Sequence, residues 1–204
     1  MMMSDLKLVI ASNNQDKIRE IQSILGNSFL KVVSYRDIFN RHIEAVEDGD
    51  TFKANAIKKV EIFPPRDDII YLGEDSGLVV DWLNGAPGIY SARYAGENTP
   101  HKEKCYKILQ EMHGAGNRDA RFVAAMAVRF PDETVDVVEA KVEGRLAHEY
   151  LGENGFGYDP IFMPEEHEET FGQLEDSLKQ GLSHRYRALM KVKPLIEAFV
   201  GTPV

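Results

Sequence analysis

The stretch DIIYLGEDSG, residues 68–77, decides the fold. Its first half is aliphatic and β-branched, which is typical of a buried strand, and two adjacent carboxylates, Glu74 and Asp75, stand at its end. Adjacent side chains of a strand point to opposite faces, so both carboxylates face one ligand only if the chain turns, which the glycine at the end of the stretch permits. We therefore expect a strand that ends at Gly73, a turn at the acidic pair, and a second short strand over 78–82.

Outward from this stretch, helical and strand-like segments alternate before it and strand-rich sequence follows it. Apolar spacing and turn residues predict strands over 6–11, 29–33, 121–130 and 134–142, and helices over 17–25, from 51 to the prolines at 64 and 65, over 102–112 and over 184–200. Helical connections early in the chain and a hairpin later indicate a mixed α/β sheet. The glycine-containing connection over 113–118 is either a hinge between lobes or a plain surface loop.

The composition excludes several classes of protein. The 204 residues are 43% hydrophobic and 28% charged, which fits one globular domain, or two lobes that share a core, better than a disordered chain. The formal net charge of −9 excludes nucleic-acid binding by general neutralisation of phosphates. Any phosphate that the chain binds must therefore be bound locally.

Cysteine usage and hydropathy favour the cytoplasm. Cys105 is the single cysteine, so the chain has no internal disulfide. No apolar run approaches the roughly 20 residues that span a bilayer, and Met1–Ser4 lack the basic and apolar regions of a signal peptide. We expect a cytoplasmic protein without membrane contact.

The segment between the first strand and the first helix is a candidate anion site. Free backbone amides and the helix dipole favour an anion there, and Lys17 adds a positive charge. The segment is not a Walker loop, so the side chains of Ser12 and Asn14 must replace some of the backbone donors. The alternative is that these polar residues only cap the helix. The candidate residues are Ser12, Asn13, Asn14, Gln15, Asp16 and Lys17.

Carboxylates in two segments are candidate magnesium ligands. Glu74 and Asp75, together with Glu47 and Asp48 of an acidic loop, offer the hard oxygen ligands that Mg²⁺ prefers, with water and substrate phosphates in the remaining positions. Acidic loop residues are otherwise simply solvated, so Asp75 is the strongest candidate. The acidic run over 165–169 lacks regular spacing and is interpreted as a solvated loop.

Two later segments have the chemistry of a base-binding site. Glycines flank Phe156, so a ligand can approach the backbone and a planar base can stack on the ring, while Asp159 can accept from N–H groups of the base. The alternative is a tight turn with Phe156 packed in the core. Lys179, His184 and Arg185 lie near the start of the final helix, where donors suit an oxygen-bearing ligand.

These segments, in this order, resemble the inosine triphosphate pyrophosphatase family, the dITP/XTP pyrophosphatases that act on non-standard purine nucleoside triphosphates. The resemblance extends from the first strand to Arg185. Its motifs are Thr51-Phe52 with Asn55-Ala56, Asp75-Ser76-Gly77-Leu78, the run over 85–94, the run over 155–160, and Ser183-His184-Arg185. The combination is specific, whereas any one motif alone would be weak.

The resemblance implies an α/β fold with an elongated mixed β-sheet, flanking helices and two lobes around a central cleft, as a single domain over 1–204. It also implies a homodimer and Mg²⁺ as cofactor. Asp75 matches the metal-binding carboxylate that activates water, and Ser12, Asn14 and Lys17 match phosphate-binding positions. The other implied substrate positions are Ser76, Phe156, Gly157, Tyr158, Asp159, Lys179, His184 and Arg185.

The second metal ligand departs from the pattern of the family. Relatives have paired glutamates before the Thr-Phe motif, whereas this chain has Val46 at the first of these positions and Glu47 at the second. Glu44, Glu47 and Glu74 therefore remain candidates.

The resemblance implies Mg²⁺-dependent hydrolysis of ITP, dITP and XTP to the monophosphate and pyrophosphate, which keeps these nucleotides out of DNA and RNA. In our hypothesis water attacks the α-phosphorus, Asp75 deprotonates it and Lys17 stabilises the leaving group, while Lys179 and Arg185 recognise the oxygen at position six of the base. Two alternatives are a pyrophosphatase for modified pyrimidine nucleotides and a non-catalytic nucleotide-sensing module. Asp75 and Lys17 argue against a sensor, because binding a base alone requires neither.

Overall fold

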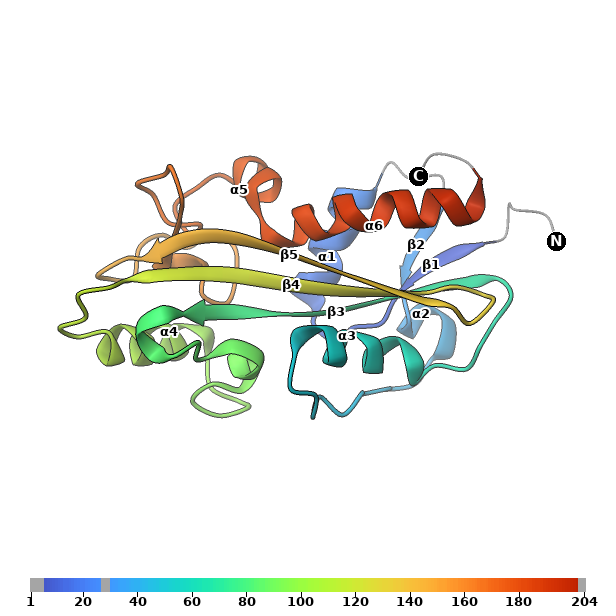
Figure 1. Ribbon diagram of the computed structural model, residues 1–204, viewed down its shortest axis with the longest axis horizontal. Coiled ribbons are helices and arrows are strands. Elements are labelled where there is room, and N and C mark those ends of the chain that lie inside the picture. The colour runs from blue at the N-terminus through green and yellow to red at the C-terminus, as the bar shows by residue number, and fades with distance from the viewer. Residues whose placement is uncertain (1–5, 27–29, 202–204) are drawn as a thin grey trace. The chain divides into compact units, whose positions relative to one another are not determined.

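The computed structural model describes residues 6–26 and 30–201 (Figure 1). The strands are β1 (Lys7–Ile10), β2 (Lys31–Ser34), β3 (Ile69–Val80), β4 (Asp119–Arg129), β5 (Val135–Leu146) and β6 (Phe162–Pro164). The α-helices are α1 (Gln15–Leu25), α2 (Arg36–Phe39), α3 (Phe52–Glu61), α4 (His101–Glu111), α5 (Asp176–Leu182) and α6 (His184–Val200), and the short 3₁₀ helices are η2 (Asp81–Leu83), η3 (Gly88–Arg93) and η4 (Asp159–Ile161). The helices expected from the sequence are present, although α1 begins at Gln15 rather than Lys17. Phe29, the predicted start of the second strand, lies outside the described residues.

The strands form one mixed sheet in the order β2-β1-β3-β4-β5-β6. Strand β1 pairs in parallel with both β2 and β3, whereas β5 pairs antiparallel with β6. Parallel pairing requires crossover connections, and α1 and α3 lie on the connections that join these parallel strands in sequence. The neighbouring strands β4 and β5 follow one another through a short turn, as predicted for the hairpin. The structure thus confirms the mixed α/β class.

The chain divides into two compact units. The first contains the described residues up to Asp75, with Ala124–Ala140 and the chain from Arg185 onward, and the second contains Ser76–Val123 and Lys141–His184. Residues 113–118, where we expected a hinge or a surface loop, lie inside the second unit, and the hinge stays a prediction.

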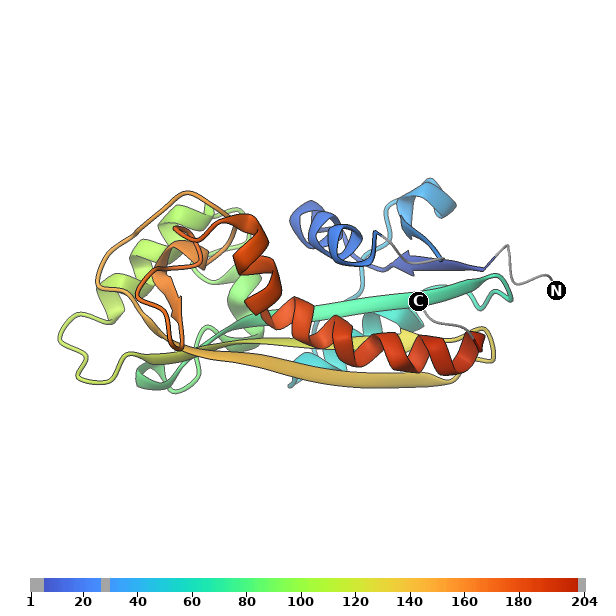
Figure 2. The same cartoon turned by 90° about the horizontal axis from the view of Figure 1, so that it is seen from above.

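The first unit buries both faces of its strands. Leu8 and Ile10 of β1 belong to one apolar cluster with residues of α1 and α6, whereas Val9 belongs to another with residues of α2 and α3. Alternate side chains of a strand point to opposite faces, so this division follows directly from the sequence LVI. Helices therefore cover both sides of these strands, with α6 on one face and α3 on the other (Figures 1 and 2).

Strand β3 is longer than the sequence suggested. We expected a strand to Gly73, a turn, and a second strand over 78–82, and this was wrong because β3 runs without interruption from Ile69 to Val80. A Cβ atom on Gly77 would lie 2.4 Å from the backbone oxygen of Gly88 and 2.4 Å from Ser91 Oγ. The glycine therefore makes room for η3 to approach the strand and forms no turn.

The second unit has one apolar core. Leu78 and Val80 of β3, Ile108 of α4 and Phe122 of β4 belong to one cluster with Phe162 of β6. Helix α4 buries Cys105 and Ile108 on the same side, as the helical spacing of its apolar residues predicts. No helix of the described part of the chain is long and apolar enough to cross a membrane.

Candidate active site

Glu74 and Asp75 leave β3 on opposite faces, and both are buried, with 2% and 4% of their surface exposed. Two successive carboxylates in an uninterrupted strand cannot face one ligand from the same side. Burial of an ionised carboxylate is costly unless cations and hydrogen-bond donors surround it. Each of the two carboxylates therefore needs its own partners, and all the partners described below lie in the first unit.

Asp75 is bound by side chains of α3. Asn55 Nδ2 donates to Asp75 Oδ2 at 3.1 Å, and Lys59 Nζ donates to Asp75 Oδ1 at 3.0 Å. Lys59 Nζ also lies 2.8 Å from Glu47 Oε1 and donates to the backbone oxygen of Glu74 at 2.9 Å. The Lys59 ammonium group thus contacts two carboxylates and a carbonyl from two segments of the chain, the acidic loop and β3.

Glu74 is bound by Arg185, at the start of α6. Arg185 Nε and Nη2 donate to the two oxygens of Glu74 at 2.7 Å each, which is a bidentate ion pair. The third nitrogen, Nη1, donates to Glu20 of α1. Lys17 Nζ lies 3.6 Å from Glu74 Oε1. All three nitrogens of the Arg185 guanidinium therefore donate to carboxylates of the first unit.

Burial and neighbouring charges shift the pKa values of these cations in different directions. Burial lowers the pKa of Lys17, and the attraction of Glu74 offsets this only in part. Burial also acts to lower the pKa of Lys59, but Asp75 and Glu47 outweigh it and the net shift is upward. The pKa of Arg185 is raised because Glu74 and Glu20 outweigh its burial. Lys59 and Arg185 are thus held as cations, while Lys17 has the weakest hold on its proton.

Some residues of the polar segment before α1 cap the helix or position the loop, and others reach the site. Asn14 is the N-cap, since its side chain accepts from the backbone nitrogens of Asp16 and Lys17. Ser12 Oγ accepts from Asn14 N, while Asn13 contacts Tyr35, Arg36 and the backbone of Ile43. These contacts favour the capping interpretation for Asn14 and a loop-positioning role for Asn13.

The remaining members of that segment face different partners. Gln15 is exposed, and Asp16 pairs with Arg19 one helical turn away. Lys17 is the member whose side chain joins the carboxylate cluster around Glu74.

The predicted base-binding loop forms a second cluster, in the second unit. Lys179 Nζ lies 2.7 Å from Asp159 Oδ2, which also accepts from Phe156 N at 2.8 Å. The same ammonium lies 5.3 Å from the centre of the Phe156 ring. A Cβ on Gly155 would lie 2.1 Å from Asp159 Oδ2, and its φ of +73° also favours glycine. Phe156 is half-buried and is not a member of the apolar core, so the alternative of a core phenylalanine is wrong.

Tyr158 and Gly157 connect this loop to the rest of the second unit, and His184 packs on β4. Tyr158 is buried and donates through its hydroxyl to the backbone oxygen of Ser91 at 2.8 Å, and Gly157 accepts from the Cys105 thiol at 3.3 Å. Burial, with the nearby charge of Asp159, raises the pKa of the Cys105 thiol to about 12. His184 stacks on Phe122 with ring centres 4.7 Å apart.

Two other predicted substrate residues, Ser76 and Arg185, lie at the boundaries of the two units in sequence. Ser76 is half-buried in β3 and is the first residue of the second unit. Arg185 contacts Glu74 and Glu20 of the first unit, so its contacts differ from those of the Phe156 loop, with which we grouped it. Its recognition of a base stays a prediction.

Comparison with known proteins identifies the family of this chain. Residues 8–195 match the sequence profile of the Ham1 family. The chain belongs to the Ham1 family. The dITP/XTP pyrophosphatase of Clostridium tetani (strain Massachusetts / E88) is 40% identical over 196 residues, which cover 95% of this chain and 97% of the relative. That of Bacillus subtilis (strain 168) is 42% identical over 193 residues, with coverages of 93% and 96%.

The fold agrees with a solved Ham1 structure as well. A HAM1 protein from Coxiella burnetii superposes with a TM-score of 0.83 at 34% identity, covering 95% of this chain and 99% of that one. The resemblance inferred from the motifs is thereby confirmed at the level of the family.

Three residues of the cluster around Glu74 and Asp75 in this Ham1 chain were not predicted as site residues: Glu20, Asn55 and Lys59. Glu20 follows Lys17 by one turn of α1, and Lys59 follows Asn55 by one turn of α3. Side chains at these spacings lie on one face of a helix, so helical periodicity was the signal that could have found them. Asn55 was noted as part of a motif but received no role.

The carboxylates can be ranked as ligands of a cation. Glu47 and Asp75 converge on the Lys59 ammonium, whereas Glu74 is engaged by Arg185 and Glu44 pairs with His42 at a side chain that is 73% exposed. The described residues contain no group of three or more histidine, cysteine or acidic side chains arranged to bind a metal ion. Two carboxylates that already surround one cation fit a Mg²⁺ ion with few protein ligands.

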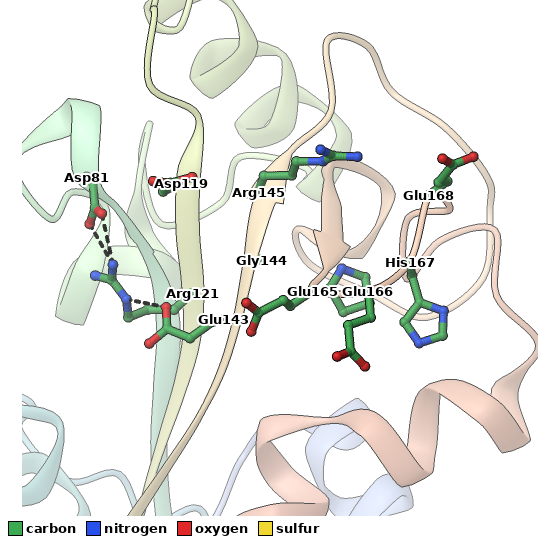
Figure 3. A pocket seen from close by; sticks show the side chains of 11 residues that line it. Asp81, Asp119, Arg121, Glu143, Gly144, Arg145, Glu165, Glu166, His167 and Glu168 are labelled. Carbon is green, nitrogen blue, oxygen red and sulfur yellow. Dashed lines mark hydrogen bonds and ion pairs between the residues drawn. The ribbon is translucent and has the colours of Figure 1, made fainter.

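An acidic pocket of about 670 Å³ lies elsewhere in the second unit (Figure 3). Its lining includes residues 165–168 of the run that we interpreted as a solvated loop. Arg121, which also lines the pocket, pairs with Asp81 and Glu143 at 2.8 Å and 2.9 Å. None of the predicted site residues lines this pocket. It is therefore separate from the chemistry of both clusters.

Proposed function

We propose that the chain hydrolyses ITP, dITP and XTP to the nucleoside monophosphate and pyrophosphate. The carrying observation is that Asp75, a buried carboxylate, is held between Asn55 and Lys59 with Glu47 at the same ammonium. A base-binding module alone has no use for such an arrangement. The names of the relatives, dITP/XTP pyrophosphatases, support the same reaction.

The first unit supplies the phosphate chemistry in this proposal. Asp75 orients a water molecule and takes its proton as the oxygen attacks the α-phosphorus. The bond from the α-phosphorus to the bridging oxygen then breaks, and pyrophosphate leaves. Lys17 and Lys59 stabilise the negative charge that develops on the phosphate oxygens.

Asp75 and Glu47 are the residues that would hold a Mg²⁺ ion. When bound, Mg²⁺ supplies neutralisation of phosphate charge. Hard carboxylate oxygens suit this ion, and the two groups already converge on one cation, Lys59. The magnesium dependence is part of the proposal.

The second unit supplies the selection of the base. Phe156 is half-buried and offers a face for stacking, and the Lys179 ammonium, fixed by Asp159, is a donor for the oxygen at position six of hypoxanthine or xanthine. Adenine has an amino group there, which cannot accept a hydrogen bond from that ammonium, and a site that hydrogen-bonds one group disfavours a substrate that lacks it by roughly 10⁴ or more in kcat/KM. Guanine shares the oxygen, so its exclusion depends on the amino group at position two.

We also propose a cytoplasmic homodimer. The resemblance to the pyrophosphatase family implies the dimer, and the lone, buried thiol of Cys105 fits a reducing compartment. Light scattering coupled to size-exclusion chromatography measures the oligomeric state, and a monomer at micromolar concentration would contradict the dimer.

One assay tests the reaction against its alternatives. Pyrophosphate release is measured with and without Mg²⁺ for ITP, XTP, GTP, ATP and modified pyrimidine triphosphates. Release from ITP and XTP that requires Mg²⁺ supports the proposal, and a GTP rate within a few-fold of the ITP rate contradicts the guanine exclusion. Release only from pyrimidines indicates the pyrimidine enzyme, and binding without any release indicates a sensor.

A further inference from the structure

Asn55 is a fully buried side chain, at 0% exposure, with a hydrogen bond at each end of its amide. Its Oδ1 accepts from the backbone nitrogen of Gly49 at 2.9 Å, and its Nδ2 donates to Asp75 Oδ2 at 3.1 Å. The amide therefore connects the acidic loop, which contains Glu47, to the carboxylate on β3.

The two bonds fix the orientation of the amide. If the amide were rotated by half a turn, its NH₂ group would face the N–H of Gly49 and its oxygen would face the carboxylate of Asp75. Donor would then meet donor, and acceptor would meet acceptor. Gly49 thus determines that a donor, and never an acceptor, faces Asp75.

The acidic loop is closely packed on this amide. A Cβ atom on Gly49 would lie 2.7 Å from Asn55 Oδ1 and 2.9 Å from the Cβ of Ala54. Only glycine fits that approach without displacement, so the position of the loop depends on the position of the amide.

The partners of Asp75 divide the work between its two oxygens. Lys59 brings a charge to Oδ1, whereas Asn55 brings a directed but neutral donor to Oδ2. A carboxylate has about four acceptor positions, and two donors leave the rest for other partners. Asp75 is thus held in one rotation while it retains acceptor positions.

We propose that Asn55 is a positioning residue for the hydrolysis. It acts through Asp75, whose rotation it fixes, and through Gly49, by which it sets the acidic loop beside that carboxylate. The inference rests on the proposed function, in which Asp75 is the base.

Two substitutions separate the bonds of Asn55. Asn55→Asp keeps an acceptor for Gly49 N but loses the donor to Asp75, and Asn55→Ala loses both. Loss of a hydrogen bond that orients a ligating carboxylate lowers activity roughly 10- to 100-fold. We expect this fall in kcat for ITP in both variants, with KM within about threefold of the wild type because neither bond contacts substrate. Asn117→Asp, the same chemical change at an exposed residue of the second unit, is the control and keeps kcat.

A double-mutant cycle with Asp75→Asn distinguishes positioning from a general structural role. Without the Asp75 carboxylate, adding Asn55→Asp, which keeps the acceptor for Gly49 N, is expected to change the residual rate by less than about threefold. The inference is overturned if Asn55→Asp keeps wild-type kcat, if Asn55→Asp lowers the residual rate as strongly as it lowers the wild-type rate, or if thermal melts show that neither variant folds. If Asp75→Asn itself retains full ITP hydrolysis, the catalytic assignment of the proposed function fails first, which is a different result.

Discussion

Glu74 and Asp75 are consecutive residues of one strand, but their surroundings differ in kind. Glu74 accepts two hydrogen bonds from Arg185, and the third nitrogen of the same guanidinium donates to Glu20. Asp75 is held by one amide and one ammonium, and that ammonium is shared with Glu47. Arginine stays charged at all relevant pH values and its bidentate pair is rigid, so the face at Glu74 resembles a structural ion pair, while the face at Asp75 resembles a site.

Asp75→Asn gives the largest expected effect. The amide cannot take a proton from water, and loss of a general base lowers kcat roughly 10²- to 10⁴-fold, while most groups that bind ITP remain. Pyrophosphate release measures kcat, and isothermal titration calorimetry measures whether ITP still binds. A variant that turns over at the wild-type rate would remove the distinction between the two faces.

Glu74→Gln is expected to affect stability more than catalysis. The substitution removes the negative charge that faces the buried guanidinium of Arg185, and breaking a buried ion pair costs about 3 kcal/mol or more of unfolding free energy. Urea unfolding measures this loss. At a temperature where the variant is folded, kcat is expected to stay within about tenfold of the wild type.

Glu143→Gln is the control for this change, because Glu143 pairs with Arg121 at a side chain that is 38% exposed. An exposed ion pair contributes at most about 1 kcal/mol. If Glu74→Gln unfolds like the wild type but loses activity as Asp75→Asn does, then Glu74 belongs to the catalytic face.

The sequence predicts the strand and its two carboxylates, but it does not predict which cations bind them. An aliphatic run that leads into Glu74 and Asp75 correctly identified the strand and its acidic pair. The turn was wrong because periodicity cannot reveal that the charges are neutralised by Arg185 and Lys59, which come from distant parts of the chain. Because these cations compensate the burial of the two carboxylates, the strand can continue past Gly73.

The same limit applies to the residues near α1. Ser12–Lys17 were grouped as one anion site because free backbone amides and the helix dipole were expected there, yet the side chain of Asn14 caps the helix and that of Asp16 pairs with Arg19. Lys17 joins Glu74 because it points back toward the sheet from the first turn of α1. Contiguity in sequence could not show which side chains share a direction, whereas the spacing from Lys17 to Glu20 could have.

Glu47→Gln tests the role of the face at Asp75 in Mg²⁺ binding, and its expected effect on the rate is smaller. The variant keeps an oxygen near Lys59 but loses a negative charge that we assign to Mg²⁺ binding, so we expect the Mg²⁺ concentration for half-maximal rate to rise roughly 10- to 100-fold. A magnesium titration of ITP hydrolysis measures the shift. Glu44→Gln, at an exposed side chain of the same loop, is the matched control and should leave the titration unchanged.

Glu20→Gln gives the smallest expected change and tests how far the structural face extends. The side chain of Glu20 is 26% exposed and bonds one nitrogen of Arg185, so water can partly replace it once its charge is removed. We expect a loss of about 1 kcal/mol of unfolding free energy, measured by urea unfolding, because the bidentate pair with Glu74 stays intact. A loss as large as that of Glu74→Gln would mean that Arg185 needs both carboxylates equally. The bidentate geometry predicts otherwise, since Nε and Nη2 both donate to Glu74 whereas Nη1 donates to Glu20.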